Sequence, residues 1–117
     1  MSDVTLYHYS GCSKSRAAVE LLETRGIDAK VVHYVDTPLN AQQLSNLLGK
    51  LNLSARQLIR DTESAYNEMG LSNPALSEAQ LIDAMVQAPI LMQRPILEVG
   101  ARAVIGRPLE NFNELLA

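Results

Sequence analysis

The hydrophobic and polar positions at the start of the chain first alternate and then change period. Over residues 4–9, Val4, Leu6 and His8 fall on one side of an extended segment and the residues between them on the other, which predicts a strand with one buried face. Over residues 13–25 the apolar residues recur at helical spacing, as on the buried side of a helix. The sequence therefore predicts a strand that leads directly into a helix.

A second strand is predicted after this helix. Gly26 stands where the helix can end, because glycine is favoured just beyond a helix C-terminus. The β-branched run A-K-V-V-H-Y-V at residues 29–35 then favours extended structure as far as the turn that ends in Pro38. A right-handed crossover through one helix makes the two strands parallel. The chain is thus predicted to open with a parallel β-α-β unit.

The middle of the chain is predicted to be helical. The sequences N-x-x-Q at residues 40–43 and S-x-x-Q at residues 77–80 resemble capping boxes, in which two side chains satisfy the first free N–H groups of a helix. Each is followed by an apolar stripe at helical spacing. Ser54 is a candidate cap for a shorter helix that ends near Arg60, and residues 63–73 are expected to form a polar connection.

The end of the chain is predicted to form a β-hairpin and a last helix. The apolar runs P-I-L-E-V and A-V-I are separated by Gly100, Ala101 and Arg102, and a helix is expected near residues 109–116. The hairpin adds antiparallel partners to the parallel pair. This order predicts an α/β, thioredoxin-like fold, with a four-stranded mixed sheet flanked by helices and a helical insertion after the second strand. With 117 residues, we expect a single domain over residues 1–117.

Composition and charge narrow the classes of function. The net charge of -3 and the isoelectric point near 5.3 argue against nucleic acid or an anionic membrane as a partner, since both attract basic faces. The sequence shows neither a secretory leader nor a long apolar span, so we expect a cytoplasmic protein. One cysteine permits no disulfide within the chain, and any thiol redox chemistry must use a second thiol from elsewhere.

That cysteine, Cys12, lies in Y-S-G-C-S-K-S-R between the first predicted strand and helix. A helix N-terminus and nearby cations lower the pKa of a thiol from about 8.5 to roughly 3.5–7.5. A lone cysteine is most often a small buried core residue, but the neighbours of Cys12 are small and polar. We therefore predict a reactive thiolate. One cysteine and two separated histidines make no metal-ligand cluster, so no metal site is expected.

Four charged or titratable residues are candidates for the same site. Arg16 falls in the first predicted helical turn, where it either points into solvent or binds an anion together with free N–H groups. His8 is a core histidine by default and alternatively an imidazolium that favours the thiolate. Arg94 and Arg107 each precede a proline, which favours extended backbone and places both guanidinium groups at constrained corners. Surface salt bridges are their default role. The Arg94–Pro95 bond can be trans or cis.

Four motifs occur along the chain in the order C-S-K-S-R, R-x-L-I-R-D-T, P-I-L-M-Q-R-P-I and I-G-R-P. With these motifs the chain resembles the glutaredoxin-dependent arsenate reductase (ArsC) family of thioredoxin-like proteins over nearly its whole length. The resemblance implies a catalytic nucleophile at Cys12, oxyanion binding by Arg60, Arg94 and Arg107, and thiolate activation by His8 and Ser15.

The resemblance also implies a reaction, the reduction of arsenate to arsenite in arsenic resistance. Cys12 attacks arsenic, glutathione is the co-substrate that forms a mixed arsenic–sulfur adduct, glutaredoxin completes the reduction, and no cofactor is bound. A tyrosine-phosphatase loop is excluded because its C-x-x-x-x-x-R spacing requires arginine where Ala18 stands. Two relatives of the same fold stay open as alternatives, since fold alone does not select a function: a glutathione-dependent thiol reductase and a non-enzymatic, Spx-like regulator that binds RNA polymerase.

Overall fold

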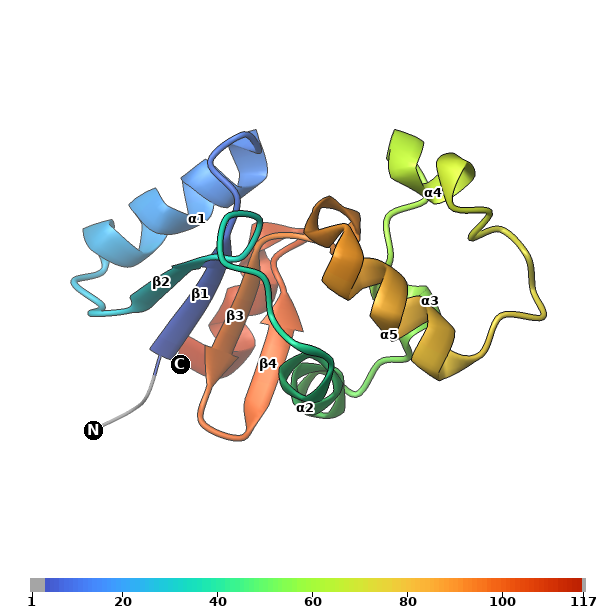
Figure 1. The fold of residues 1–117 in the computed structure, drawn as a ribbon. Helices are drawn as coiled ribbons and strands as arrows, with labels where there is room; N and C mark the ends of the chain where they lie inside the picture. The colour runs from blue at the N-terminus through green and yellow to red at the C-terminus, as the bar shows by residue number, and fades with distance from the viewer. Residues whose placement is uncertain (1–3, 117) are drawn as a thin grey trace. The chain divides into compact units, whose positions relative to one another are not determined.

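The computed structural model describes residues 4–116, and the chain divides into two compact units (Figure 1). The first unit combines Met1–Thr37 with Arg94–Ala117, and the second is Pro38–Gln93. The first holds the β-sheet, and the second is the predicted helical insertion. That the whole chain behaves as one domain stays a prediction. Within residues 4–116, no helix is both long enough and apolar enough to cross a membrane.

The sheet has four strands, β1 (Val4–His8), β2 (Lys30–His33), β3 (Ile96–Val99) and β4 (Arg102–Ile105). Their order is β2-β1-β3-β4. β1 and β2 are parallel, whereas β3 is antiparallel to both β1 and β4. The predicted thioredoxin-like mixed sheet is therefore confirmed.

The core of the first unit lies on one face of this sheet. Leu6 of β1 is paired with Leu97 of β3, and neither is accessible to solvent. The helix α1 (Ser13–Thr24) runs alongside the sheet in Figure 1 and packs against this face. Burying one leucine side chain stabilises a fold by roughly 1.5–3 kcal/mol. The buried members of this cluster are Val4, Leu6, Ala18, Leu22, Leu97 and Phe112.

The C-terminal segment completes the first unit. It consists of a 3₁₀ helix, η2 (Leu109–Phe112), followed by α6 (Asn113–Leu116). Phe112 is fully buried in the cluster just described, and Leu116 packs against it. The predicted last helix is thus present, with its first turn tightened to 3₁₀ geometry.

The second unit is helical, as predicted. Its elements are α2 (Ala41–Leu51), α3 (Ala55–Leu58), α4 (Ser64–Glu68), α5 (Glu78–Gln87) and the 3₁₀ helix η1 (Pro89–Leu91).

Both predicted capping boxes begin helices of the second unit. The Gln43 N–H donates to the Asn40 side chain at 2.8 Å, and the Gln43 side chain accepts from the Asn40 N–H at 2.9 Å. Ser77 and Gln80 form the same reciprocal pair. Ser54 caps α3 as expected. Because each cap satisfies N–H groups that have no helical acceptor, each stabilises its helix by about 1 kcal/mol.

Three local predictions were inexact, each for a physical reason. The polar connection over residues 63–73 contains α4, which has no buried residue and hence no apolar period to reveal it. The Arg56 guanidinium holds this segment by donating to the carbonyls of Leu71 and Asn73.

The other two differences concern the ends of strands. β2 covers only part of residues 29–35, and Arg102 begins β4 instead of belonging to the turn.

Gly106 supplies a stability test of the packing around Phe112. A Cβ at this position would lie 2.7 Å from the Phe112 ring and 3.1 Å from Pro95 Cγ. Gly106→Ala should therefore lower the free energy of unfolding by about 1–3 kcal/mol, the usual cost of overpacking a core. Urea denaturation followed by circular dichroism measures this change.

Gly49 provides the matched control. It lies inside α2 with no atom within 4 Å of an added Cβ. Gly49→Ala should raise the free energy of unfolding by about 0.5–1 kcal/mol, because alanine loses less backbone entropy in a helix. Equal urea midpoints for Gly106→Ala and the unsubstituted protein would contradict the packing described here.

Candidate active site

Cys12 occupies the N-cap position of α1. Its backbone is extended (φ -111°, ψ 123°), its N–H donates to the Tyr9 carbonyl at 3.1 Å, and its carbonyl accepts from Arg16 N–H at 3.0 Å. The short loop after β1 therefore delivers the thiol to the end of the helix where N–H groups lack helical acceptors. Its side chain is half-buried, so the sulfur is neither fully exposed nor sealed in the core.

The surroundings of Cys12 lower the pKa of its thiol. Burial alone would raise this pKa, but the backbone N–H groups of Ser15 and Lys14, a hydrogen bond from Arg94 and the positive charge of Arg107 outweigh burial. The Cys12 side chain forms no capping hydrogen bond of ordinary geometry, so the two N–H groups act mainly as oriented dipoles that stabilise negative charge. The geometry thus favours the thiolate predicted from sequence.

Two guanidinium groups converge on the Cys12 sulfur. Nη2 of Arg107 lies 3.3 Å from Sγ, and the side chain of Arg94 contributes the hydrogen bond that lowers the thiol pKa. Nε of Arg107 donates to the Arg94 carbonyl at 2.7 Å, which fixes the orientation of the Arg107 guanidinium. Arg94 is 6% exposed whereas Arg107 is exposed. Although Arg107 makes the 3.3 Å contact with the sulfur, we expect Arg94 to have the larger electrostatic effect, because water screens a buried charge less.

The two prolines that follow these arginines both adopt the cis form. The peptide bonds Arg94–Pro95 and Arg107–Pro108 are cis. The sequence left the isomer of the first bond open and gave no indication of the second.

Ser15 connects His8 to the loop that carries Cys12. The Ser15 hydroxyl is fully buried, accepts from the Tyr9 N–H at 3.0 Å and lies 2.6 Å from Nδ1 of His8. Burial, and then the charge of neighbouring His33, lower the pKa of His8, while hydrogen bonding with Ser15 opposes them only in part. The lowered pKa favours the neutral imidazole of His8. Thiolate activation by His8 stays a prediction, and its contact with the loop that carries Cys12 is made through Ser15.

The other two predicted oxyanion ligands are placed differently. Nη1 of Arg16 donates to the Ser10 carbonyl at 2.7 Å, so one edge of this exposed guanidinium fixes the loop before Cys12. Arg60 belongs to the second compact unit, where its Nε donates to the Glu63 carboxylate at 3.1 Å. Oxyanion binding by Arg16 and Arg60 stays a prediction, while Arg94 and Arg107 are brought together at Cys12.

Sequence reasoning missed two residues next to the thiol. The Tyr9 ring centroid lies 5.0 Å from Cζ of Arg94, and the Tyr9 ring leaves no room for a side chain at Gly11. The only sign of this contact in the sequence was that a glycine, Gly11, follows Tyr9 by two positions. The 85-residue separation of Tyr9 from Arg94 hid their contact.

Among residues 4–116, no three histidine, cysteine or acidic side chains are grouped so that they could hold a metal ion.

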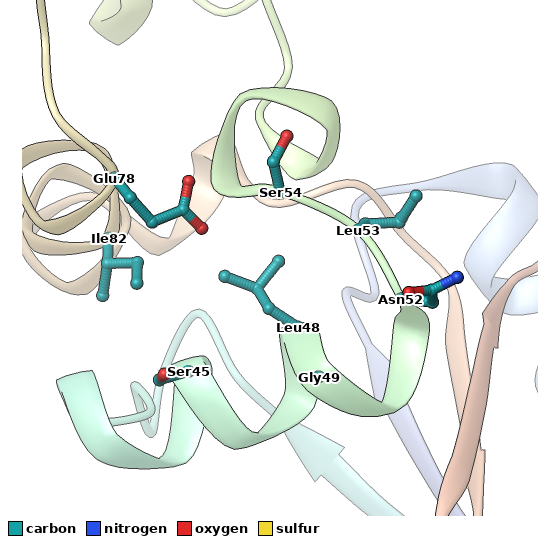
Figure 2. Close-up of a pocket in the computed structure, with 8 residues that line it drawn as sticks. All are labelled: Ser45, Leu48, Gly49, Asn52, Leu53, Ser54, Glu78 and Ile82. Atoms are coloured by element: carbon teal, nitrogen blue, oxygen red, sulfur yellow. The ribbon is translucent and has the colours of Figure 1, made fainter.

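A pocket in the second unit is chemically different from the Cys12 site. Figure 2 shows Leu48, Glu78 and Ile82 around this hollow of about 500 Å³, which lies between α2, the start of α3 and α5. Its only charged lining residue is Glu78, and Oε2 of Glu78 accepts from the Ala55 N–H at 2.9 Å. This pocket offers neither a nucleophile nor a cation for an oxyanion.

Comparison with known proteins identifies relatives over nearly the full chain. A family profile described as "ArsC family" matches residues 7–115. An arsenate reductase of Neisseria meningitidis is 44% identical, and the match covers 99% of this chain and all of the relative. An arsenate reductase of Escherichia coli is 34% identical, covering 99% of this chain and 82% of the relative. The solved arsenate reductase from Vibrio cholerae is 37% identical with a TM-score of 0.92, covering 96% of each chain.

Proposed function

Because the chain belongs to the ArsC family, we propose that it reduces arsenate to arsenite through a covalent adduct at Cys12. One observation carries this proposal: the Cys12 thiol sits at the N-terminus of α1 with the guanidinium groups of Arg94 and Arg107 at its sulfur. A nucleophile and the cations that would hold a tetrahedral oxyanion are thus in one place. The names of the two curated relatives and the solved structure support arsenate as the oxyanion.

Arsenate would replace part of the contact between the sulfur and the arginines. Arg107 uses Nε for the Arg94 carbonyl, and its Nη2 lies 3.3 Å from the sulfur, where an oxyanion can accept charge-assisted hydrogen bonds. Arg94 adds a buried positive charge. On the family resemblance alone, Arg60 is a further proposed ligand of the anion. The place of Arg16 in the first turn of α1 supports an auxiliary role. Guanidinium groups suit this task because they bind oxyanions with paired N–H groups.

The first chemical step forms a bond between Cys12 and arsenic. The thiolate attacks arsenic(V), a sulfur–arsenic bond forms, and one arsenic–oxygen bond breaks with loss of hydroxide, or of water when a proton is supplied. The arginines stabilise the negative charge on the remaining oxygens as the transition state develops. Arsenic stays in its +5 state in this step, because no electron pair has been transferred to it.

The reduction itself requires two external thiols, since the chain has one cysteine. Glutathione condenses with the adduct, forming a second sulfur–arsenic bond with loss of water. A glutaredoxin thiolate then attacks the glutathione sulfur, a disulfide forms, and the electron pair of that sulfur–arsenic bond stays on arsenic. Arsenic(III) is released when water cleaves its bond to Cys12, which regenerates the thiol.

Ser15 and His8 support the thiolate indirectly in this account. The Ser15 N–H is one of the dipoles that lower the Cys12 pKa, and the Ser15 hydroxyl holds the Tyr9 N–H in place. His8 lies 2.6 Å from that hydroxyl and orients it. Both are therefore positioning residues for the nucleophile.

The function is tested by incubating the purified protein with arsenate, glutathione, glutaredoxin and a regenerating reductase and measuring arsenite. We expect arsenite to form only when protein, arsenate and both thiol donors are present. Reduction of a glutathione mixed disulfide without arsenite formation would favour the thiol-reductase alternative. Absence of both activities, together with capture of RNA polymerase, would favour the regulator.

A further inference from the structure

Tyr9 and Gly11 lie close to each other beside Cys12, and neither has a role in the proposed reaction. The Tyr9 ring lies against the guanidinium of Arg94, with 5.0 Å between Cζ and the ring centroid. This distance is within the range of a cation–π interaction. Arg94 itself is 6% exposed, so the ring supplies part of the surface that encloses the positive charge.

The same ring explains the glycine at position 11. A Cβ on Gly11 would lie 2.6–2.8 Å from Cζ, Oη and Cε2 of Tyr9, closer than non-bonded carbon atoms approach. Gly11 is not among the glycines with a positive φ, which are Gly26, Gly70 and Gly100. Its backbone conformation therefore does not require glycine, and the space occupied by the Tyr9 ring does.

The main chain of Tyr9 is also fixed by the site. Its N–H donates to the Ser15 hydroxyl at 3.0 Å, and its carbonyl accepts from the Cys12 N–H at 3.1 Å. Tyr9 thus contacts the nucleophile through its backbone and Arg94 through its ring. Because these two attachments belong to one residue, Tyr9 links the guanidinium of Arg94 to the loop that carries the sulfur.

We propose that Tyr9 is a positioning residue, whose ring holds the Arg94 guanidinium at Cys12, and that Gly11 is glycine to admit this ring. The part that concerns oxyanion binding rests on the proposed function, whereas the part that concerns the thiol does not. A cation–π contact attracts the guanidinium to the ring without requiring one of its N–H groups as a hydrogen-bond donor. Removal of the ring leaves Arg94 charged and less confined.

The thiol itself provides the first test. The rate of alkylation of Cys12 by iodoacetamide is measured against pH for Tyr9→Leu, Tyr9→Phe and the unsubstituted protein. Tyr9→Leu should move the inflection to higher pH and slow alkylation at pH 7 by about three- to tenfold, the range that a partly desolvated cation–π contact implies. Tyr9→Phe keeps an aromatic face and should restore the original profile.

Tyr7→Leu is the matched control, because Tyr7 lies in β1 two residues before Tyr9 and its hydroxyl donates to Glu98 at 2.6 Å instead. It should leave the alkylation profile unchanged. An unchanged profile for Tyr9→Leu, or equal shifts for Tyr9→Leu and Tyr7→Leu, would overturn the proposal.

Gly11→Ala tests the same contact from its other side. Alone, it should displace the Tyr9 ring and shift the profile in the direction of Tyr9→Leu. In a Tyr9→Leu background it should add almost nothing, because the ring that it would strike is absent. Additive shifts would contradict the proposal. Gly11→Ala also keeps the test possible should Tyr9→Leu fail to fold.

Oxyanion binding is measured separately, as the protection that arsenate gives Cys12 against alkylation by iodoacetamide. Tyr9→Leu should require about three- to tenfold more arsenate for half-protection, if Arg94 binds the anion as proposed. If arsenate does not protect the unsubstituted protein, the proposed function fails, while the alkylation profiles still decide whether Tyr9 positions Arg94.

Discussion

Cys12→Ser should abolish arsenite formation, with kcat/KM reduced by about 10³-fold or more, to the level of the reaction without protein. The substitution keeps the size of the side chain and its place at the N-cap of α1. It replaces a thiol whose pKa is lowered by its surroundings with a hydroxyl that stays protonated at neutral pH. No sulfur–arsenic bond can then form, so the reaction is stopped at its first step.

The measurement is arsenite release in the coupled assay with glutathione and glutaredoxin. Ser13→Ala is the matched control, because Ser13 is exposed and adjacent in the first turn of α1, and it should retain activity. Arsenite formation by Cys12→Ser within tenfold of the unsubstituted rate would rule out Cys12 as the nucleophile.

Arg94→Ala should have the next largest effect, lowering kcat/KM for arsenate by about 10²-fold, as removal of one charged oxyanion donor does. Arg94 has two roles in the proposed reaction. Its hydrogen bond lowers the pKa of the Cys12 thiol, and its buried guanidinium is proposed to bind the arsenate anion. The thiolate population and the affinity for arsenate should therefore fall together, so both alkylation at pH 7 and arsenate protection should weaken.

Arg107→Ala is the comparison for this prediction. Its guanidinium lies 3.3 Å from the sulfur but is exposed, and its charge is the smallest of the causes that lower the thiol pKa. We expect a smaller shift of the alkylation profile than for Arg94→Ala, because solvent screens an exposed charge. A larger shift for Arg107→Ala would show that proximity outweighs burial at this site.

The fold was predictable where one residue period or cap determines the local structure. Alternation in Val4–His8 placed the strand, and Gly26, with its φ of +66°, ended the helix as expected. The capping box at Asn40 fixed the start of α2. In contrast, α4 and the segment after it are held by the guanidinium of Arg56, which donates to the Tyr66 hydroxyl in α4 and to two carbonyls beyond it. No local pattern in the sequence records such a long-range contact.

In the candidate site, too, local sequence predicts some features, whereas others depend on contacts between residues far apart in the chain. The position of Cys12 after a strand and before a helix was enough to predict an activated thiol, because helix N-termini stabilise anions wherever they occur. The convergence of Arg94 and Arg107 was expected only through the family motifs, since both are more than 80 positions away along the chain. The lowered pKa of His8 depends on burial and on the charge of His33, which the sequence alone does not show.

The pH dependence of Cys12 alkylation in the unsubstituted protein is the most direct test of the account. The thiolate is the reacting form, so the rate rises with pH through the pKa of Cys12 in the folded protein. We predict an inflection clearly below the value of about 8.5 for an ordinary free cysteine, and loss of this difference in Arg94→Ala. An inflection at or above about 8.5 would contradict an anion-stabilising site at Cys12.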